Sequence, residues 1–245
     1  MSLRGARVLV TRAEQDRGPL EDLLAARGAI PIAFPCIEFE EIEAVLPEQA
    51  DFVAVASAHA ARLLRERAPG LFENAQFAAA GAGTAAALGR PALVPAQGVG
   101  ADALAALLEP LVRGKVVLVP RAEGGTPALP ERLARAGARV VAVSLYRTVP
   151  VRAANAPGLA ELRAGRVDAI AFASGSAAQG FAALLGAEAR ALTTRAAVVC
   201  MGKSCAEAAR AVGLPVAAIS EGGFAELCEA LGRALVRQRE SREPT

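Results

Sequence analysis

The sequence predicts an α/β protein made of two doubly wound, parallel-sheet domains, and three observations lead to this prediction. The chain has 245 residues, which suits two domains of about 120 residues each. Hydrophobic residues make up 53% of the chain but aromatic residues only 4%, so Ala, Val and Leu must build the core. Short apolar runs rich in β-branched residues alternate with longer stretches of helical periodicity, which is typical of parallel sheets.

Ten of the short apolar runs are predicted to be strands. A continuous run such as residues 116–119 suits a strand that is covered on both faces by helices. Between the runs, apolar residues recur at helical spacing, as Leu104, Leu107, Leu108 and Leu111 do. The predicted strands lie near residues 7–11, 29–33, 52–56, 77–80, 91–94, 115–119, 138–143, 168–172, 196–201 and 215–219.

The two halves of the chain resemble one another. The matching segments, in chain order, are 10–14 with 119–123, 54–57 with 171–174, and 80–81 with 201–202. Three matches in one order, with slowly growing separations, indicate a duplication followed by small loop insertions.

Two extended, proline-containing segments, 34–38 and 146–150, interrupt the alternation at equivalent places in the two copies. We predict that the chain crosses between the domains at both segments. The first domain would then contain residues 1–35 and 151–245, and the second residues 38–147. Each domain would receive five strands, which is enough for a small doubly wound sheet.

The composition excludes several classes of function. The net charge is +2 and the basic residues form no run with interleaved aromatics, which argues against a nucleic-acid partner. The first residues contain no apolar signal core, and no apolar run approaches the roughly 18 residues that span a bilayer, so we expect a cytoplasmic protein without a membrane partner. Four cysteines without paired spacing are expected to be buried thiols: Cys36, Cys200, Cys205 and Cys228.

Histidine chemistry is restricted by the presence of a single histidine, His59. A histidine-rich metal site is impossible, and no metal is expected. The two-residue spacing from Ser57 argues against a Ser-His pair, because such side chains point in different directions on a helix. We interpret His59 as a partly exposed residue of a first helical turn.

Glycine-rich turns follow two of the predicted strands. Residues 81–86 match the Gly-x-Gly-x-x-Ala form of a dinucleotide-binding turn, so a nicotinamide-dependent enzyme that uses the Gly81 loop is a rival hypothesis. Residues 202–204 resemble the end of a phosphate-binding loop, but the first glycine of that motif would fall at Ala197, inside a strand. A noncatalytic two-lobed receptor for a small anion is the second rival.

The repeated strand ends are the best candidates for a binding site. Ser57 and Ser174 each end a strand and begin a helix, where a serine caps the helix or contacts a ligand, and both roles remain open. Gly81 and Gly202 also end strands, and Thr84 and Ser204 follow them. Such turns present backbone N–H groups and the positive end of a helix dipole, which attract carboxylate or phosphate groups.

In their order and spacing, these motifs resemble the uroporphyrinogen-III synthase family from about Arg7 to Leu235. The residues that carry the likeness are 8–12, 35–38, Ala56, Ser57, Gly81, Thr84, 119–121, 146–148, 172–176, Met201 and Gly202. The chain departs from the family at Ala56, Ala173 and Cys205, where threonine is common.

The resemblance implies two flavodoxin-like domains joined by a two-stranded linker. It also implies a lyase that cyclises hydroxymethylbilane to uroporphyrinogen III, with loss of water and inversion of ring D, in haem, sirohaem and cobalamin biosynthesis. No cofactor would be required, and the strand ends of the two domains would face one another across a cleft. The enzyme would be a cytoplasmic monomer that receives its substrate from hydroxymethylbilane synthase.

The resemblance also suggests roles for individual residues. Tyr146, the only tyrosine, would donate a proton to the departing hydroxyl, although packing alone would also explain it. Arg12 and Arg121 would pair with charge or fix the strand-end loops, and Arg147 is a further candidate for charge pairing. The full set of expected substrate-binding residues is Thr11, Arg12, Ser57, Gly81, Thr84, Arg121, Ser174, Gly175, Ser176, Gly202, Lys203 and Ser204.

Overall fold

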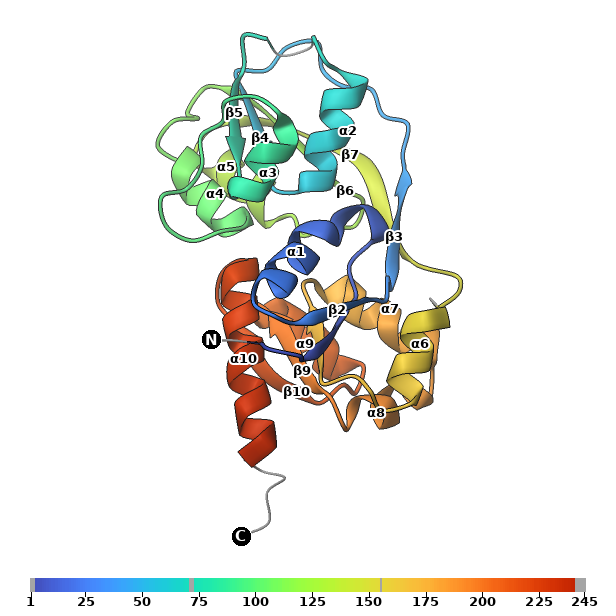
Figure 1. Cartoon of the computed structure of the whole chain (residues 1–245). Helices are drawn as coiled ribbons and strands as arrows, with labels where there is room; N and C mark the ends of the chain where they lie inside the picture. Colours follow the sequence, from blue (N-terminus) through green and yellow to red (C-terminus); the bar gives the residue numbers. More distant parts are fainter. Residues whose placement is uncertain (1–2, 71–72, 155, 241–245) are drawn as a thin grey trace. The chain divides into compact units, whose positions relative to one another are not determined.

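In a computed structural model, residues 3–70, 73–154 and 156–240 are described, and the chain divides into two compact units. Unit 1 contains the chain up to Phe39 and again from Val149 onward, and unit 2 is the continuous segment Glu40–Thr148. Each unit is built on a sheet of its own (Figure 1). Within the described residues, no helix combines the length and the apolar character that crossing a membrane requires.

Unit 1 contains a five-stranded sheet in the order β10-β9-β8-β1-β2. Its neighbouring strands β1–β2, β1–β8, β8–β9 and β9–β10 are all parallel. The strands are β1 (Arg7–Val10), β2 (Ile30–Ala33), β8 (Ala169–Phe172), β9 (Ala197–Met201) and β10 (Val216–Ser220). The helices are η1 (Glu14–Asp16), α1 (Gly18–Ala26), α6 (Ala156–Arg163), α7 (Gly175–Leu185), α8 (Glu188–Thr193), α9 (Lys203–Ala211) and α10 (Phe224–Glu240).

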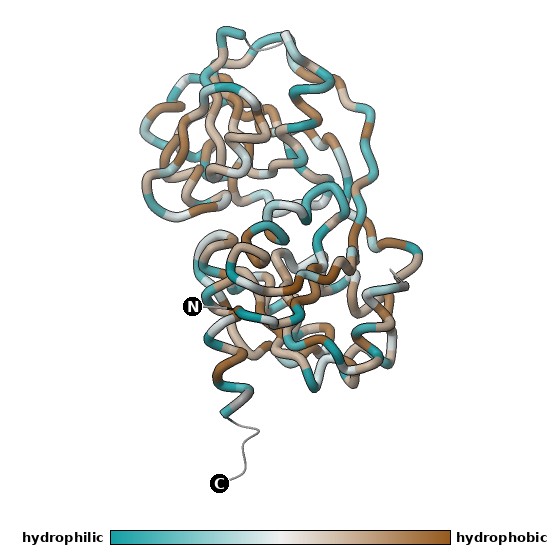
Figure 2. Tube along the Cα trace, viewed as in Figure 1, coloured by the Kyte–Doolittle hydropathy of each residue, from teal (hydrophilic) through white to brown (hydrophobic). Residues whose placement is uncertain are grey.

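The sheet of unit 1 is covered on both faces, as the continuous apolar strands predict. Leu9 and Ile170 point into a core that α6, α7, α8 and α9 complete, whereas Val8 and Val10 point to the opposite core beneath α1 and α10. Hydrophobic and hydrophilic residues alternate along α10 (Figure 2), because only one side of this helix packs on the sheet.

Unit 2 contains a sheet in the order β3-β7-β6-β4-β5, in which β4–β5, β4–β6 and β6–β7 are parallel. Its α4 and α5 place leucines on one face of the sheet, and α2 contacts β4 and β6. The strands are β3 (Ile37–Glu41), β4 (Phe52–Val55), β5 (Gln76–Ala79), β6 (Val116–Ala122) and β7 (Arg139–Pro150). The helices are α2 (Ala58–Arg67), α3 (Ala82–Leu88), α4 (Ala101–Leu108) and α5 (Ala128–Arg135).

The two sheets repeat the same strand order, although each mixes strands from both halves of the chain. The order β2-β1-β8-β9-β10 of unit 1 is the 2-1-3-4-5 order of flavodoxin-like sheets. The order β7-β6-β4-β5 of unit 2 follows the same scheme with the sequence repeats exchanged: β6 replaces its counterpart β1, and β4 replaces its counterpart β8. The flavodoxin-like α/β prediction is therefore confirmed for each unit.

One expectation about a strand needs correction. The predicted strand at 91–94 is only an isolated bridge between Leu93 and Ala78, although it occupies the place beside β5 that β10 occupies beside β9. Pro91 and Pro95 flank it and have no N–H to continue a ladder. The predicted connectors 34–38 and 146–150 are extended and partly strand, in agreement with the implied two-stranded linker: β3 begins at Ile37 and β7 continues to Pro150.

Candidate active site

The predicted site residues lie at the carboxyl ends of strands in both units. In unit 1 they follow β1, β8 and β9, and in unit 2 they follow β4 and β5 or lie near the ends of β6 and β7. Because β1, β8 and β9 run parallel in one sheet and β4 to β7 run parallel in the other, the carboxyl ends of these strands share one edge of each sheet. The sequence prediction thus selects one edge of each sheet, and each edge is described by itself.

In unit 2, Tyr146 is the centre of a small polar cluster. The phenol oxygen of Tyr146 lies 2.9 Å from the Ser57 Oγ, within hydrogen-bonding distance. The ring of His59 meets the ring of Tyr146 edge to face, with centroids 4.6 Å apart and planes at 86°. Tyr146 is buried, with 5% of its surface exposed. Both of these contacts come from the start of α2, where Ser57 supplies the hydroxyl and His59 supplies the ring.

Ser57 is the N-cap of α2, which is one of the two roles that the sequence left open. Its Oγ accepts a hydrogen bond from the Ala60 backbone N–H at 3.3 Å, and its backbone is extended, with φ −134°. His59 is only 6% exposed, so the expectation of a partly exposed residue was wrong. Helical spacing could not reveal this burial, because the ring that packs on His59 comes from Tyr146 in β7, far along the chain.

Gly81 and Thr84 lie at the start of α3, beside β5. Gly81 has extended backbone angles, and a Cβ at this position would make only an ordinary contact, 3.6 Å from the Val99 Cγ1. Neither its conformation nor its neighbours therefore require glycine. Thr84 is half-buried in the first turn of α3.

Arg121, near the end of β6, bonds to its own loop. Its guanidinium donates hydrogen bonds to the carbonyl oxygens of Ala122 and Gly125, which is the loop-fixing alternative considered for this residue. Arg147, in β7, forms an ion pair with Glu123 at 3.3 Å and lies 4.0 Å from Glu40, with about half of its side chain exposed.

In unit 1, Ser174 caps α7 as Ser57 caps α2. The Ser174 Oγ accepts from the Ala177 N–H at 3.2 Å and receives the Ser176 hydroxyl at 3.4 Å. At Gly175 a Cβ would approach the Ala208 Cβ to 2.8 Å, so glycine lets α7 and α9 pack closely at this end. The capping prediction from the repeat therefore holds for both serines.

Gly202, Lys203 and Ser204 form the turn from β9 into α9. Gly202 has φ +79°, the left-handed region that favours glycine, and its N–H donates to the Ser220 carbonyl at 2.9 Å. Lys203 and Ser204 are exposed in the first turn of α9, where the leading backbone N–H groups have no acceptor within the helix.

Thr11 and Arg12 support the end of β1. The Thr11 hydroxyl is fully buried and donates to the Ala171 carbonyl at 2.8 Å, which joins β1 to β8. The Arg12 guanidinium donates to the Asp16 carbonyl at 2.8 Å, lies 3.4 Å from the Asp16 carboxylate and stacks over the Phe224 ring at 4.8 Å. Both side chains are engaged within unit 1.

Cys205, which stands where the family commonly has threonine, lies in the core of unit 1. Cys205 is 2% exposed, and its thiol donates to the Phe172 carbonyl at 3.5 Å. A hydrogen bond with Cys205, together with burial, raises the pKa of the Cys200 thiol. Burial also raises the pKa of Cys36 well above its usual value. Raised pKa values keep the Cys36 and Cys200 thiols protonated, and a protonated thiol is a poor nucleophile.

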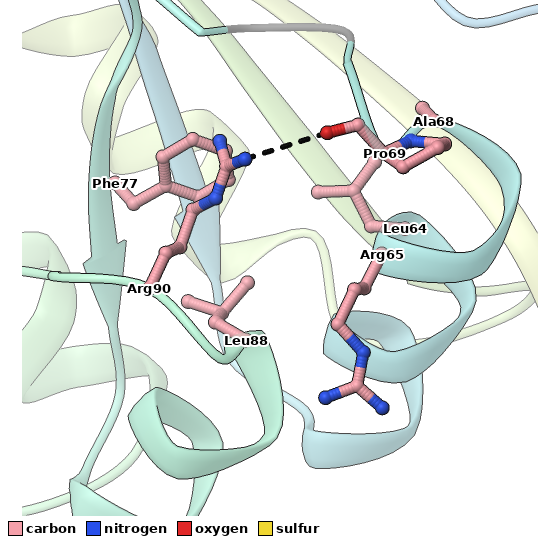
Figure 3. Close-up of a pocket in the computed structure, with 7 residues that line it drawn as sticks. All are labelled: Leu64, Arg65, Ala68, Pro69, Phe77, Leu88 and Arg90. Atoms are coloured by element: carbon pink, nitrogen blue, oxygen red, sulfur yellow. Dashed lines mark hydrogen bonds between the residues drawn. The ribbon is translucent and has the colours of Figure 1, made fainter.

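The side chains offer no obvious metal site, since the described residues contain no group of three His, Cys, Asp or Glu placed to hold an ion. The pocket in Figure 3 lies at the amino end of β5, between the ends of α2 and α3, where Arg90 stacks over Phe77. Its volume of about 20 Å³ suits little more than a water molecule. A larger groove of about 610 Å³ lies at the amino ends of β9 and β10, and the predicted site residues line neither space.

A family model described as uroporphyrinogen-III synthase HemD matches residues 3–226, which is most of the chain. The chain belongs to this family. In fold it is similar to a uroporphyrinogen-III synthetase from Helicobacter pylori 26695, with a TM-score of 0.63, 17% identity and coverage of 94% of this chain and 99% of that one. It is also similar to a mutant uroporphyrinogen III synthase from the extremely thermophilic bacterium Thermus thermophilus, with a TM-score of 0.54, 23% identity and coverage of 95% and 100%.

Membership of the uroporphyrinogen-III synthase family establishes the class of activity. The chain is an enzyme of tetrapyrrole biosynthesis, a cyclising lyase that acts on a small molecule, as the sequence resemblance implied. Neither the nicotinamide-dependent oxidoreductase nor the noncatalytic anion receptor is favoured by these matches.

Proposed function

We propose that this uroporphyrinogen-III synthase family member uses Tyr146 as the proton donor when hydroxymethylbilane loses its terminal hydroxyl group. The contact between the Tyr146 phenol and Ser57, at the carboxyl edge of unit 2, is the observation that supports this role most directly. A phenol O–H is a donor that can give its proton to a leaving hydroxide.

The reaction requires only a weak acid at this position. The electron-rich pyrrole nitrogen pushes out the hydroxyl group, so the C–O bond breaks as a proton arrives and water leaves. The remaining cation is attacked by the substituted carbon of ring D, and rearrangement through a spiro intermediate inverts that ring before the macrocycle closes. The proton lost as the last pyrrole regains aromaticity restores the phenol, so the balance is the loss of one water. Correct placement of the two chain ends therefore contributes most of the rate.

We further propose that the strand-end turns hold the acetate and propionate groups of the substrate. In unit 1, the exposed first turn of α9 with Lys203 and Ser204, and the capped start of α7 with Gly175 and Ser176, offer N–H and hydroxyl donors. In unit 2, the turn at Gly81 and Thr84 offers the same groups. Backbone N–H groups would hold most of the carboxylates, as expected for a substrate with many similar acetate and propionate side chains.

The cationic side chains divide into two groups in this proposal. Lys203 is the charge partner for a substrate carboxylate, because it is exposed beside the α9 N-terminus. Arg12 and Arg121 instead hold the strand-end loops, because their guanidinium groups already bond within their own units, and Thr11 supports the end of β1. Arg147 stays paired with Glu123 and steers acidic substrate only through its exposed half.

The decisive assay supplies freshly generated hydroxymethylbilane and separates the isomers that form. Spontaneous closure gives the unrearranged type I ring, so an excess of type III over a protein-free control supports the proposal, and type I alone would refute it. Tyr146→Phe is expected to lower kcat by about 100-fold, the lower end of the usual range for general acids. An unchanged kcat in a folded Tyr146→Phe protein would remove the acid role.

The surroundings of the reaction are also proposals. We infer that the enzyme works in the cytoplasm as a monomer and receives hydroxymethylbilane from hydroxymethylbilane synthase, because the free substrate closes spontaneously to the wrong isomer. The described residues contain no membrane-spanning helix, and the family acts on a small molecule, which supports this setting. Size-exclusion chromatography with light scattering tests the monomer, and a dimer mass would contradict it.

A further inference from the structure

Ser57 makes two hydrogen-bonding contacts of different kinds. Its Oγ accepts the Ala60 N–H at 3.3 Å, which caps α2, and it also lies 2.9 Å from the Tyr146 phenol oxygen. Its counterpart in the repeat, Ser174, makes the same cap at 3.2 Å with Ala177, but its second contact is the Ser176 hydroxyl. Capping alone therefore does not require a phenol, and the contact with Tyr146 is an additional feature of unit 2.

The chemistry of the hydroxyl favours one direction for the bond between Ser57 and Tyr146. A serine hydroxyl has one proton to donate and two lone pairs. Accepting the Ala60 N–H at the positive end of α2 draws electron density from the Ser57 oxygen, which makes its O–H a stronger donor and the oxygen a weaker second acceptor. The phenol oxygen is then the acceptor, and the phenol proton is not used in this bond.

We propose that Ser57 is a positioning residue that donates its proton to the Tyr146 oxygen and so directs the phenol's own proton toward the substrate. The same bond stabilises negative charge on the phenol oxygen as that proton leaves. His59 completes the arrangement, because its edge-to-face contact with the Tyr146 ring restricts ring rotation. This inference rests on the acid role proposed for Tyr146, and it assigns the Ser57 side chain to the tyrosine and not to a substrate carboxylate.

The direction of the bond can be measured without any substrate. Tyr146 is the only tyrosine and the chain has no tryptophan, so the tyrosine Fermi doublet in a Raman spectrum reports this one side chain. The intensity ratio of the doublet is high when a phenol oxygen accepts a hydrogen bond and low when the phenol mainly donates. The wild type is expected to show a high ratio that falls in Ser57→Ala.

Three further variants serve as controls. Ser57→Thr keeps both the hydroxyl and a good N-cap, so it should retain the wild-type ratio. Ser57→Gly removes the hydroxyl with little loss of capping, which keeps the test valid if Ser57→Ala folds poorly. Ser174→Ala removes the matching cap in unit 1 and should leave the ratio unchanged. A ratio that rises or stays constant in Ser57→Ala and Ser57→Gly would overturn the proposed direction.

Kinetics then separate positioning from substrate binding. A positioning role predicts that Ser57→Gly lowers kcat roughly tenfold, about the worth of one hydrogen bond, with KM unchanged and with rescue by Ser57→Thr. A raised KM with an unchanged kcat would instead make Ser57 a substrate ligand and contradict the inference. If Tyr146→Phe keeps full activity, the proposed acid role fails, whereas the Raman ratio still decides the direction of the hydrogen bond.

Discussion

Replacement of Gly180 by alanine should destabilise unit 1, even though alanine is the better helix former. Gly180 lies inside α7, and a Cβ there would come within 2.2 Å of the Cys36 carbonyl oxygen and 3.2 Å of the Ile37 Cγ2. The nearest atom belongs to the backbone, so it cannot rotate away. The same carbonyl accepts the Val151 N–H at 3.3 Å, and moving it would weaken this bond between the two segments that leave and re-enter unit 1.

The size of the effect follows from two opposing contributions. Overpacking of a dense core costs about 1–3 kcal/mol. Replacing a helical glycine by alanine returns up to about 1 kcal/mol. Because the required shift is about 1 Å against a fixed carbonyl, we expect a net loss of about 1–2 kcal/mol in the free energy of unfolding.

A matched substitution isolates the clash from helix propensity. Gly83 also lies within a helix, α3, but a Cβ at this position meets nothing within 4 Å. Gly83→Ala should therefore stabilise unit 2, by up to about 1 kcal/mol. Urea unfolding followed by far-ultraviolet circular dichroism measures both variants. If Gly180→Ala proves as stable as the wild type or more so, the close approach of α7 to Cys36 does not exclude a side chain at this position, and the reasoning fails.

Two further substitutions in unit 1 test its electrostatics and its core. Hydrogen bonds from Arg166 and then Arg7 lower the pKa of Glu161 to about 2 from an ordinary 4.5, so its stabilising contribution is present above pH 4.5 and is lost as the pH falls toward 2. Glu161→Gln should flatten the loss of stability in that window, measured by urea unfolding at a series of pH values; a slope like that of the wild type would contradict the assignment. Phe181 is fully buried and meets the rings of Phe34 and Phe172 edge to face, with centroids 5.8 and 5.4 Å away. Phe181→Ala should cost about 3–5 kcal/mol by thermal or urea unfolding, and a loss below about 1 kcal/mol would mean that this core collapses around the gap.

The fold could be predicted from local patterns because strands covered on both faces leave a clear signal. The run 116–119 is continuously apolar and is part of β6, and the capping serines Ser57 and Ser174 mark the starts of α2 and α7. The pattern failed at 91–94, where an apolar run is flanked by prolines that cannot continue a hydrogen-bonded ladder. It also missed the length of β7, because pairing beyond Ser144 depends on neighbours that are distant in the sequence.

The candidate site was predictable as a set of strand ends but not as a set of contacts. Parallel topology alone brings Ser57 and Arg121 to one edge and Thr11 and Ser174 to another. Whether a side chain at such an edge faces a ligand or a neighbour depends on register and packing. The contact between Ser57 and Tyr146 spans 89 positions of sequence, and no periodic pattern encodes a pairing over that distance.

The exchange of strands between the two halves of the chain sets an order of events during synthesis. Unit 2 is one continuous segment and can fold as soon as it has left the ribosome. The interior strand β1 is made first, but one of its two partners, β8, comes about two-thirds of the way along the chain. The apolar faces of β1 and β2 therefore stay uncovered until nearly the whole polypeptide has been made. A chain truncated after unit 2 would leave β1 and β2 without their sheet partners, as an exposed edge that promotes aggregation.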